Sequence, residues 1–254
     1  QKKAREELEE YAKKLEKVNG ELRSMQEQLV RAEKLAAIGV LSAGLAHEIG
    51  NPLASISSVV QLLARKITDP KISDSFQSIQ THIKRISDII HNVSDFTKKN
   101  QLQLMAVDLE PLIRNILQRI CLQYNEKKIE IQTRIEPNLP RVSAEASQLS
   151  QALSNIFINS FEAIFDQGKV EVYAKKLLKE MVVISIQDSG RGIPKEHLQK
   201  IFEPFFTTKE VGKGVGLGLS VSYGIIKSFG GDIRVESIEG KGSKFEILLP
   251  MYRL

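Results

Sequence analysis

A heptad repeat at the start of the chain places the strongest constraint on its fold. Leu8, Leu15, Leu22 and Leu29 recur every seven residues, and the positions three residues later are also mostly apolar: Tyr11, Val18, Met25 and Ala32. This pattern predicts a coiled coil, because a sustained apolar seam is buried against a second helix. The alternative, a single solvent-exposed helix, would leave the leucine seam in water. We therefore expect residues 1–34 to form a dimeric coiled coil.

The apolar register shifts near residue 35 and then continues into a second helix. The later stripe contains Leu35, Ile38, Leu45, Ile49, Ile56 and Leu63. Such register breaks locally unwind or overwind a coiled coil. After the turn signal Thr68-Asp69-Pro70, a further amphipathic stripe contains Ile72, Phe76, Ile79, Ile83, Ile86, Ile90 and Val93. Two helices joined by a short turn form an antiparallel hairpin, and two such hairpins form a four-helix bundle. We assign residues 35–100 to this dimerisation unit and 101–106 to a linker.

The first helix of this hairpin carries a candidate nucleophile. His47-Glu48 precedes Asn51-Pro52 by one helical turn, and either apolar register leaves His47 off the buried seam. Histidine can act as a covalent nucleophile, and its unperturbed pKa leaves much of it neutral near pH 7. A histidine on a solvated helix face is the alternative interpretation. His82 and His91 lack a neighbouring acid and amide of this kind, so we interpret them as structural or surface residues.

Composition limits the classes of protein that this chain can represent. Its 254 residues are 42% hydrophobic and 26% charged, which indicates a folded chain rather than a disordered one. The net charge of +5 is spread along the sequence, so we expect no nucleic-acid partner. The single cysteine, Cys121, excludes an internal disulfide and indicates a reducing compartment. We therefore expect this chain to be a cytoplasmic piece of a longer protein.

The second half of the chain alternates helical and strand patterns. Helical periodicity covers 110–124, 144–165 and 218–229, and strand patterns cover 129–135, 170–174, 182–187, 232–237 and 244–249. Helices separated from a mixed sheet form an α+β sandwich. The predicted fold is therefore multidomain, with an all-α coiled coil and four-helix bundle followed by an α+β domain over 107–254.

Two segments of this domain carry residues suited to a nucleotide and its metal ion. Asn155 and Asn159 share one helix face, and amide oxygens are suitable Mg²⁺ ligands. Asp188 ends a strand pattern ahead of closely spaced glycines; a carboxylate can accept a hydrogen bond from an exocyclic amino group, and glycine lets backbone approach a flat base. A plain turn after a strand is the alternative. The candidates here are Asn155, Asn159, Asp188, Gly190, Gly192 and Ile193.

Two further segments are candidates for the phosphate end of the site. Segment 202–209 contains three phenylalanines ahead of Thr207-Thr208-Lys209; buried core is the alternative for the phenylalanines, and a solvated side chain for the lysine. Segment 212–219 alternates glycines and then begins a helix, where exposed N–H groups favour phosphate. It matches neither a Walker loop nor a dinucleotide fingerprint. The candidates here are Thr208, Lys209, Gly214, Gly216, Leu217, Gly218 and Leu219.

Taken together, these motifs resemble those of two-component sensor histidine kinases. The segment from His47 to Pro52 is similar to their phosphoacceptor motif, in the variant with Asn before the proline. The four later segments resemble those of the Bergerat-type (GHKL) ATPase superfamily, which includes gyrase and MutL. The resemblance covers about residues 35–250 in family order. It departs at Val215, where many relatives have Thr, and at Ser160, where many have Ala.

This resemblance implies a mechanism and a set of partners. It implies that Mg²⁺ binds at Asn159 with Asn155 beside the nucleotide, and that Asp188 binds the adenine amino group of ATP. Phosphate would pass to His47, with Glu48 as general base or orienting partner, and then to an aspartate of a separate response regulator. The chain would be the cytoplasmic part of a longer bacterial receptor, whose upstream sensor domain lies outside these residues.

The resemblance also implies that Asn51 orients the water that hydrolyses phospho-aspartate, which would give the protein a phosphatase activity toward the phosphorylated regulator. Two alternatives are an ATP-operated dimer clamp without phosphotransfer, and a non-enzymatic scaffold with a degenerate ATP domain.

Overall fold

The structure is a computed structural model that describes residues 15, 18, 49, 52–64, 70–97, 103–177, 180–209 and 215–253. These fall into two compact units, Gln1–Lys98 and Lys99–Leu254. Most of the predicted coiled coil over 1–34 lies outside the described residues, as do His47, Glu48, Asn51 and Gly214. Among the helices of the described part, none combines the length and apolarity that crossing a bilayer requires.

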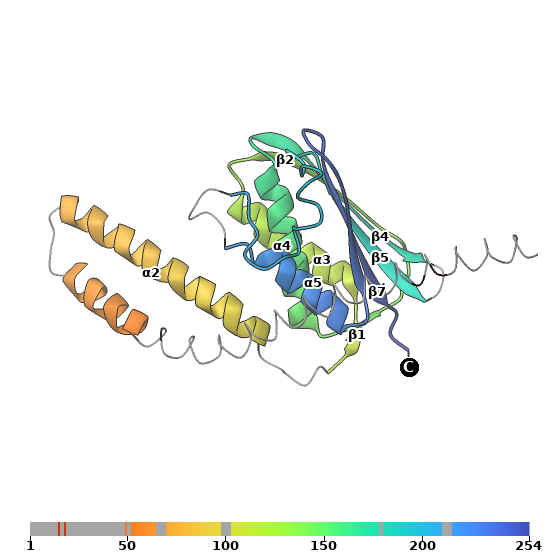
Figure 1. Ribbon diagram of the computed structural model, residues 1–254, viewed down its shortest axis with the longest axis horizontal. Coiled ribbons are helices and arrows are strands. Elements are labelled where there is room, and N and C mark those ends of the chain that lie inside the picture. The colour runs from red at the N-terminus through yellow and green to blue at the C-terminus, as the bar shows by residue number, and fades with distance from the viewer. Residues whose placement is uncertain are drawn as a thin grey trace, which may run out of the picture. The chain divides into compact units, whose positions relative to one another are not determined.

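The first unit contains a helix over 52–64 and the helix α2 (Pro70–Thr97), coloured orange to yellow in Figure 1. Proline is favoured at the start of a helix because the first N–H groups have no partner within the helix, and α2 begins at Pro70. Leu53 and Val60 of the first helix are buried with Ile83 of α2, and Phe76 packs against them. The predicted pair of amphipathic helices is therefore confirmed over these residues.

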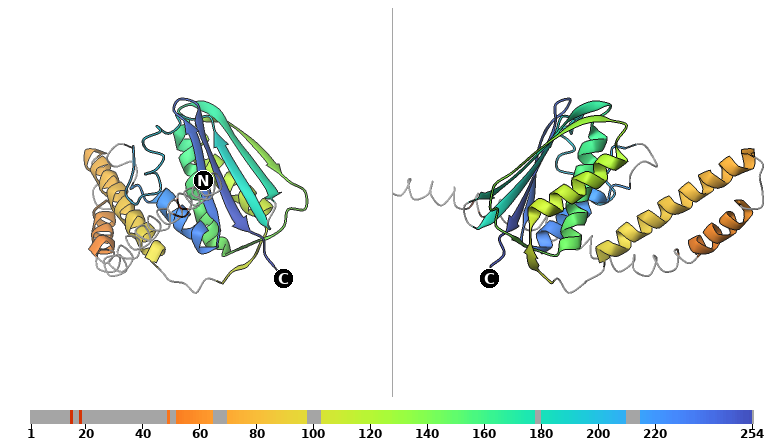
Figure 2. Two further views of the ribbon diagram at one scale, coloured as in Figure 1. Left: turned by 45° about the vertical axis from the view of Figure 1, so that its right-hand side comes forward. Right: turned by 180° about the vertical axis from the view of Figure 1, so that it is seen from behind.

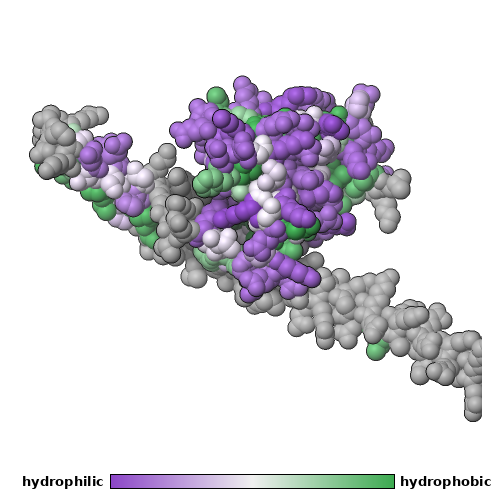
Figure 3. Space-filling model, turned by 90° about the horizontal axis from the view of Figure 1, so that it is seen from above, coloured by the Kyte–Doolittle hydropathy of each residue, from purple (hydrophilic) through white to green (hydrophobic). Residues whose placement is uncertain are grey.

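Many apolar side chains of this unit remain exposed in the single chain. They include Ile49, Ile56, Val59, Leu62, Leu63, Ile72, Ile79 and Ile86. Figure 3 shows apolar side chains gathered along one edge of the helices. Most of these residues belong to the two stripes predicted to face a partner hairpin. Pairing with a second copy would remove this surface from water.

The second unit is built on a five-stranded sheet with the strand order β2-β4-β5-β7-β6. The strands are β2 (Lys128–Ile135), β4 (Gln167–Leu177), β5 (Met181–Asp188), β6 (Asp232–Ile238) and β7 (Gly242–Pro250). The β2–β4 pair is parallel, and the other neighbouring pairs are antiparallel. A parallel pair needs a crossover connection, and the chain between β2 and β4 contains the helix α4 (Ala146–Ala163).

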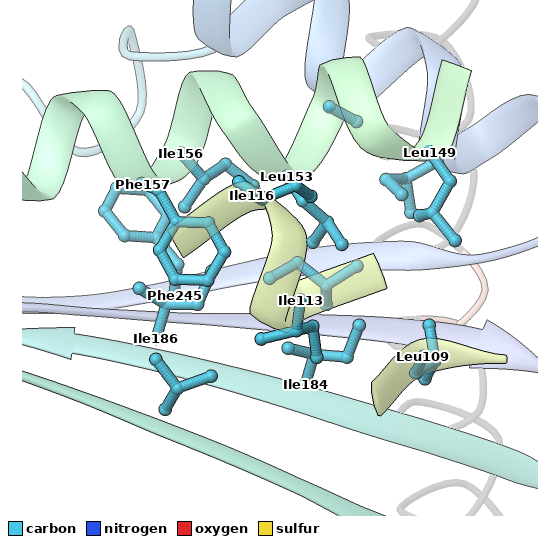
Figure 4. Close-up of a cluster of buried hydrophobic side chains, with 14 of the residues drawn as sticks. Leu109, Ile113, Ile116, Leu149, Leu153, Ile156, Phe157, Ile184, Ile186 and Phe245 are labelled. Atoms are coloured by element: carbon cyan, nitrogen blue, oxygen red, sulfur yellow. The ribbon is translucent and has the colours of Figure 1, made fainter. Parts of the chain in front are cut away.

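Three helices cover one face of this sheet: α3 (Leu109–Gln123), α4 and α5 (Gly218–Ser228) (Figures 1 and 2). Their apolar side chains meet the inward-facing side chains of the strands. Figure 4 shows Ile113 of α3, Leu153 and Phe157 of α4, and Ile184 of β5 in one cluster, and all four are fully buried. The predicted α+β sandwich is confirmed.

A second, two-stranded sheet was not predicted. It pairs β1 (Met105–Val107) with β3 (Val142–Ala144) in antiparallel register. Strands of three residues are too short to show a hydrophobic period, so the pattern gave no signal for them. As a result, β1 begins at Met105, inside the predicted linker 101–106.

Candidate nucleotide-binding site

The helix α4 carries several of the predicted site residues and is held at both ends by charged side chains. At its start, the Glu145 carboxylate accepts hydrogen bonds from the N–H groups of Ser147 (3.0 Å) and Gln148 (2.8 Å). At its end, Lys127 Nζ donates to the carbonyl oxygens of Phe161 (2.9 Å) and Ile164 (2.6 Å). These contacts satisfy backbone groups that have no partner within a helix. The face of α4 that carries the site is therefore set in a fixed position.

Asn155 connects α4 to the start of α5. Its Nδ2 atom donates to the carbonyl oxygen of Gly218, at 3.2 Å. The preceding residue, Leu217, is in the N-cap position and makes no side-chain capping bond. The first N–H groups of α5 are thus not capped by that side chain, and such a helix start favours an anion. The structure brings the candidates Asn155, Leu217 and Gly218 together.

The side chain of Lys209 reaches Asn159 on α4, and also Glu162, an acid that is not among the candidates predicted from the sequence. Lys209 Nζ lies 3.3 Å from Asn159 Oδ1 and forms a salt bridge with Glu162 Oε2. The other carboxylate oxygen of Glu162 accepts a hydrogen bond from the Tyr124 hydroxyl, at 3.2 Å. Burial raises the pKa of Tyr124, and the charge of Glu162 and this hydrogen bond raise it further. Tyr124 therefore remains a protonated donor.

Asp188 lies at the end of β5, with a side chain that is only 3% exposed. Its Oδ1 atom accepts hydrogen bonds from the N–H groups of Gly190 (2.9 Å) and Ser243 (3.3 Å). Burial raises the pKa of the Asp188 carboxyl, and these N–H groups together with the Ser160 hydroxyl counteract part of this effect. The Ser160 hydroxyl is itself buried and makes no hydrogen bond of good geometry within the described residues. Because both backbone bonds end on Oδ1, Oδ2 keeps its capacity to accept from a ligand amino group.

The glycines after Asp188 allow the loop that follows β5 to lie close to the ends of α4 and β6. A Cβ atom at Gly190 would lie 2.7 Å from the backbone of Ala163 at the end of α4. Gly192 has φ +69°, and a Cβ atom there would lie 2.1 Å from the carbonyl oxygen of Ile238. A side chain at either position would therefore displace the loop from α4 or from the end of β6.

The turn between β6 and β7 supports the same loop. Ser237 Oγ accepts from the N–H of Ile193, at 2.8 Å, and donates to the carbonyl oxygen of Gly242, at 2.9 Å. Gly242 has φ +105°, and a Cβ atom there would lie 1.9 Å from the carbonyl oxygen of Asp188. Ile193 and Asp188 are thus positioned by one turn far away in the sequence.

The remaining candidates divide between site and core. Gly216 has φ +73°, and a Cβ atom there would lie 2.5 Å from the backbone of Phe205. Leu217 is buried, and Leu219 packs against the main core, so their side chains support the start of α5. Thr208 is exposed.

Helix spacing could have identified Glu162, the acid that sequence reasoning missed. It lies three residues after Asn159 and seven after Asn155, on the same face of α4. Tyr124 and Ser243 have no local signal of this kind, because their contacts depend on the tertiary fold.

The residues present fit a magnesium nucleotide. Asn159 Oδ1 and Glu162 Oε2 already hold one cation, the Lys209 ammonium, and amide and carboxylate oxygens are suitable Mg²⁺ ligands. Asp188 offers an acceptor for an amino group, and the start of α5 offers N–H groups for phosphate. All of these groups surround α4.

Comparison with known proteins agrees with this geometry. Residues 144–253 match the family described as histidine kinase-, DNA gyrase B- and HSP90-like ATPase, and residues 37–102 match the His Kinase A (phospho-acceptor) domain. The sensor histidine kinase ZraS of Escherichia coli (strain K12) is 38% identical over 89% of this chain and 48% of its own length. The chain thus spans about half the length of this relative.

Two solved structures of the histidine kinase ThkA are also similar. Its nucleotide-free catalytic domain is 32% identical, with a TM-score of 0.51, over 59% of this chain and 96% of that one. ThkA in complex with the response regulator protein TrrA is 28% identical, with a TM-score of 0.62, over 91% of this chain and 67% of that one. On the strength of its two family matches, these relatives and the arrangement around α4, the chain belongs to the sensor histidine kinases of two-component systems.

Proposed function

We propose that this chain is an autokinase that transfers the γ-phosphate of Mg-ATP to His47. The observation that carries the proposal is that three features meet at α4. They are the buried Asp188 carboxyl, the two oxygens that hold the Lys209 ammonium, and the uncapped start of α5. The match of residues 37–102 to a phosphoacceptor domain supports a histidine as the acceptor. His47 is the histidine of that region with a neighbouring acid and an amide one turn away.

The transfer step exchanges one bond to phosphorus for another. A neutral imidazole nitrogen of His47 donates its lone pair to the γ-phosphorus, while the bond to the bridging oxygen breaks and ADP leaves with that electron pair. Glu48 accepts a proton from the imidazole, or holds the tautomer that leaves the attacking nitrogen free. Asn159 and Asn155 would hold Mg²⁺, which neutralises charge on the phosphate oxygens. Asp188 and the start of α5 position the two ends of the nucleotide.

The proposal includes partners. The phosphoryl group passes from His47 to an aspartate of a separate response regulator; the ThkA complex with TrrA supports this class of partner. The exposed apolar edge of the helical unit supports a homodimer built as a four-helix bundle. The bacterial relatives and the single cysteine support a cytoplasmic site of action in a bacterium.

Labelling with γ-phosphate tests the proposal directly. We expect wild-type protein incubated with Mg-ATP to acquire acid-labile, alkali-stable label, and His47→Gln to acquire none. His82→Gln, on α2, is the matched control and should label as the wild type does. If ATP is hydrolysed but neither the wild type nor either variant acquires label, the proposal is contradicted and the dimer clamp is favoured. Absence of both label and hydrolysis would favour the scaffold.

The proposal also assigns a phosphatase role to Asn51, one helical turn beyond His47, because the resemblance to the family implies this role for its position. The amide would orient the water that attacks a phospho-aspartate of the regulator. Asn51→Ala should therefore label normally on His47 but slow the loss of phosphate from the phosphorylated regulator. Equal rates of dephosphorylation by wild type and variant would remove this role.

A further inference from the structure

Two side chains of α4 hold a single cation, the ammonium of Lys209. The Lys209 ammonium contacts Asn159 Oδ1, at 3.3 Å, and Glu162 Oε2. The two oxygens belong to residues three apart on one helix, so they lie side by side. The side chains of Lys209 and Glu162 are 28% and 34% exposed. The pair is therefore partly withdrawn from water, unlike an ordinary surface salt bridge.

The Glu162 carboxylate is oriented before any ligand arrives. The Tyr124 hydroxyl donates to Oε1, which leaves Oε2 directed at the ammonium. Tyr124 lies just beyond α3 and its ring packs on Phe161 of α4, with 5.7 Å between ring centroids. The hydrogen bond thus comes from a fixed ring, and the arrangement presents a carboxylate oxygen and an amide oxygen to one point.

The chemistry of that point suits a divalent cation as well as an ammonium. Both oxygens are hard donors of the kind that bind Mg²⁺. A carboxylate left without a cation would repel the phosphates of a nucleotide. Two cations cannot occupy the same position, so binding of the metal requires Lys209 to leave.

Building on the proposed function, we propose that Asn159 and Glu162 form one cation position, that Lys209 fills it when no nucleotide is bound, and that Mg²⁺ replaces the ammonium when Mg-nucleotide binds. Glu162 is then part of the metal site, through Oε2 or through a metal-held water. Lys209 acts as an internal competitor of the metal. Binding of nucleotide without metal is weaker, because the phosphates then lie beside the Lys209–Glu162 pair instead of a divalent cation.

The test is the factor by which Mg²⁺ tightens ADP binding. For the full chain, the Kd of ADP is measured by calorimetry in excess EDTA and in saturating Mg²⁺, and the ratio of the two values is compared between variants. Glu162→Gln should lower this ratio roughly tenfold, because it removes an oxygen ligand of the metal and so weakens Mg-ADP more than bare ADP. Lys209→Met should raise the ratio by a similar factor, because it removes the competitor and exposes bare ADP to the carboxylate. Tyr124→Phe should lower it by less.

The controls remove the same charges elsewhere on this domain. Lys169 and Glu171 form a salt bridge of 2.7 Å on β4, and we expect Lys169→Met and Glu171→Gln to leave the ratio unchanged. A lysine that only binds phosphate would weaken both forms of ADP alike, so an unchanged ratio in Lys209→Met would overturn the inference. An unchanged ratio in Glu162→Gln would do the same.

The same measurement distinguishes failure of the proposed function from failure of this inference. If wild-type protein binds ADP neither with nor without Mg²⁺, the nucleotide site itself is wrong, and the inference falls with it. If ADP binds and only the ratios disagree, the autokinase proposal stands and the cation exchange does not.

Discussion

At the scale of single residues, the nucleotide site contains the Asp188 carboxyl, whose ionised form is disfavoured by burial in the folded protein. Asp188 is buried, and burial raises the pKa of its carboxyl. A raised pKa in the folded state means that the folded protein binds more protons than the unfolded chain between the two pKa values. The contribution of Asp188 to the free energy of unfolding therefore falls as the pH rises through the folded pKa. In the proposed function, this carboxyl serves the ligand rather than the fold.

The substitution Asp188→Asn separates the two roles. The amide oxygen can still accept from Gly190 and Ser243, so we expect no loss of stability at pH 7. ADP affinity should fall about tenfold or more, because a hydrogen bond to a charged acceptor is lost. Denaturant unfolding between pH 4 and 8 should show the wild type losing stability relative to the variant as the pH rises. A variant that binds ADP normally would contradict the adenine role.

Two glycines of the β6–β7 turn provide a matched pair. Gly240 and Gly242 have φ +77° and +105°, but only Gly242 approaches other atoms. Gly240→Ala should cost about 1 kcal/mol, from the left-handed backbone alone. Gly242→Ala should cost about 3 kcal/mol or more, because its Cβ atom would also meet the backbone of Asp188. Equal denaturation midpoints for the two variants would show that the close approach is not a real constraint.

At the scale of secondary-structure elements, α4 organises the site, and its sequence explains how much could be foreseen. Asn155 and Asn159 were predictable because helix spacing alone places them on one face. Asp188 was selected through the resemblance of its segment to the ATPase superfamily, because its place at a strand end also fits a plain turn. The partners of these residues were not, because Tyr124, Lys127 and Ser243 reach the site through contacts that no local period encodes. Glu162 lay within reach of the same spacing argument.

The N-cap of α4 gives a prediction for this element. Burial alone would raise the pKa of Glu145, but hydrogen bonds from Ser147 and Gln148 outweigh it and lower the pKa. The stabilisation is therefore present above the unfolded pKa of the carboxyl and is lost as the pH falls through the folded pKa. Glu145→Ala should cost about 1 kcal/mol at pH 7. This difference, measured by denaturant unfolding, should shrink in acid, whereas the exposed Glu126→Ala should show little effect at either pH.

At the scale of the whole chain, each unit has its own buried cluster. The main core extends from Val107 to Leu249 and lies within the second unit, whereas Leu53, Val60 and Ile83 form the cluster of the first. The helical stripes were predictable from their period, but a period does not say what covers them. In the single chain, most of the stripe residues whose burial the structure describes remain exposed. The dimer therefore stays a prediction.

Separation of the units should leave one of them functional as a binding domain. We expect residues 99–254 alone to unfold cooperatively and to bind Mg-ADP with the affinity of the full chain, because every described contact of the site lies within this unit. The same fragment should acquire no phosphohistidine, since it lacks His47. Calorimetry and acid-labile labelling measure the two outcomes. A fragment that folds but binds ADP more weakly would show that the helical unit contributes to the nucleotide site.

The hydrogen bond between Tyr124 and Glu162 also gives the molecule an intrinsic optical probe. The chain has five tyrosines and no tryptophan, so tyrosine emission is not masked. A carboxylate that accepts from a phenol quenches its fluorescence, and any ligand that draws Glu162 toward itself alters that quenching. Occupancy of the site should therefore be visible in the native protein without a label, and Tyr124→Phe should abolish the signal.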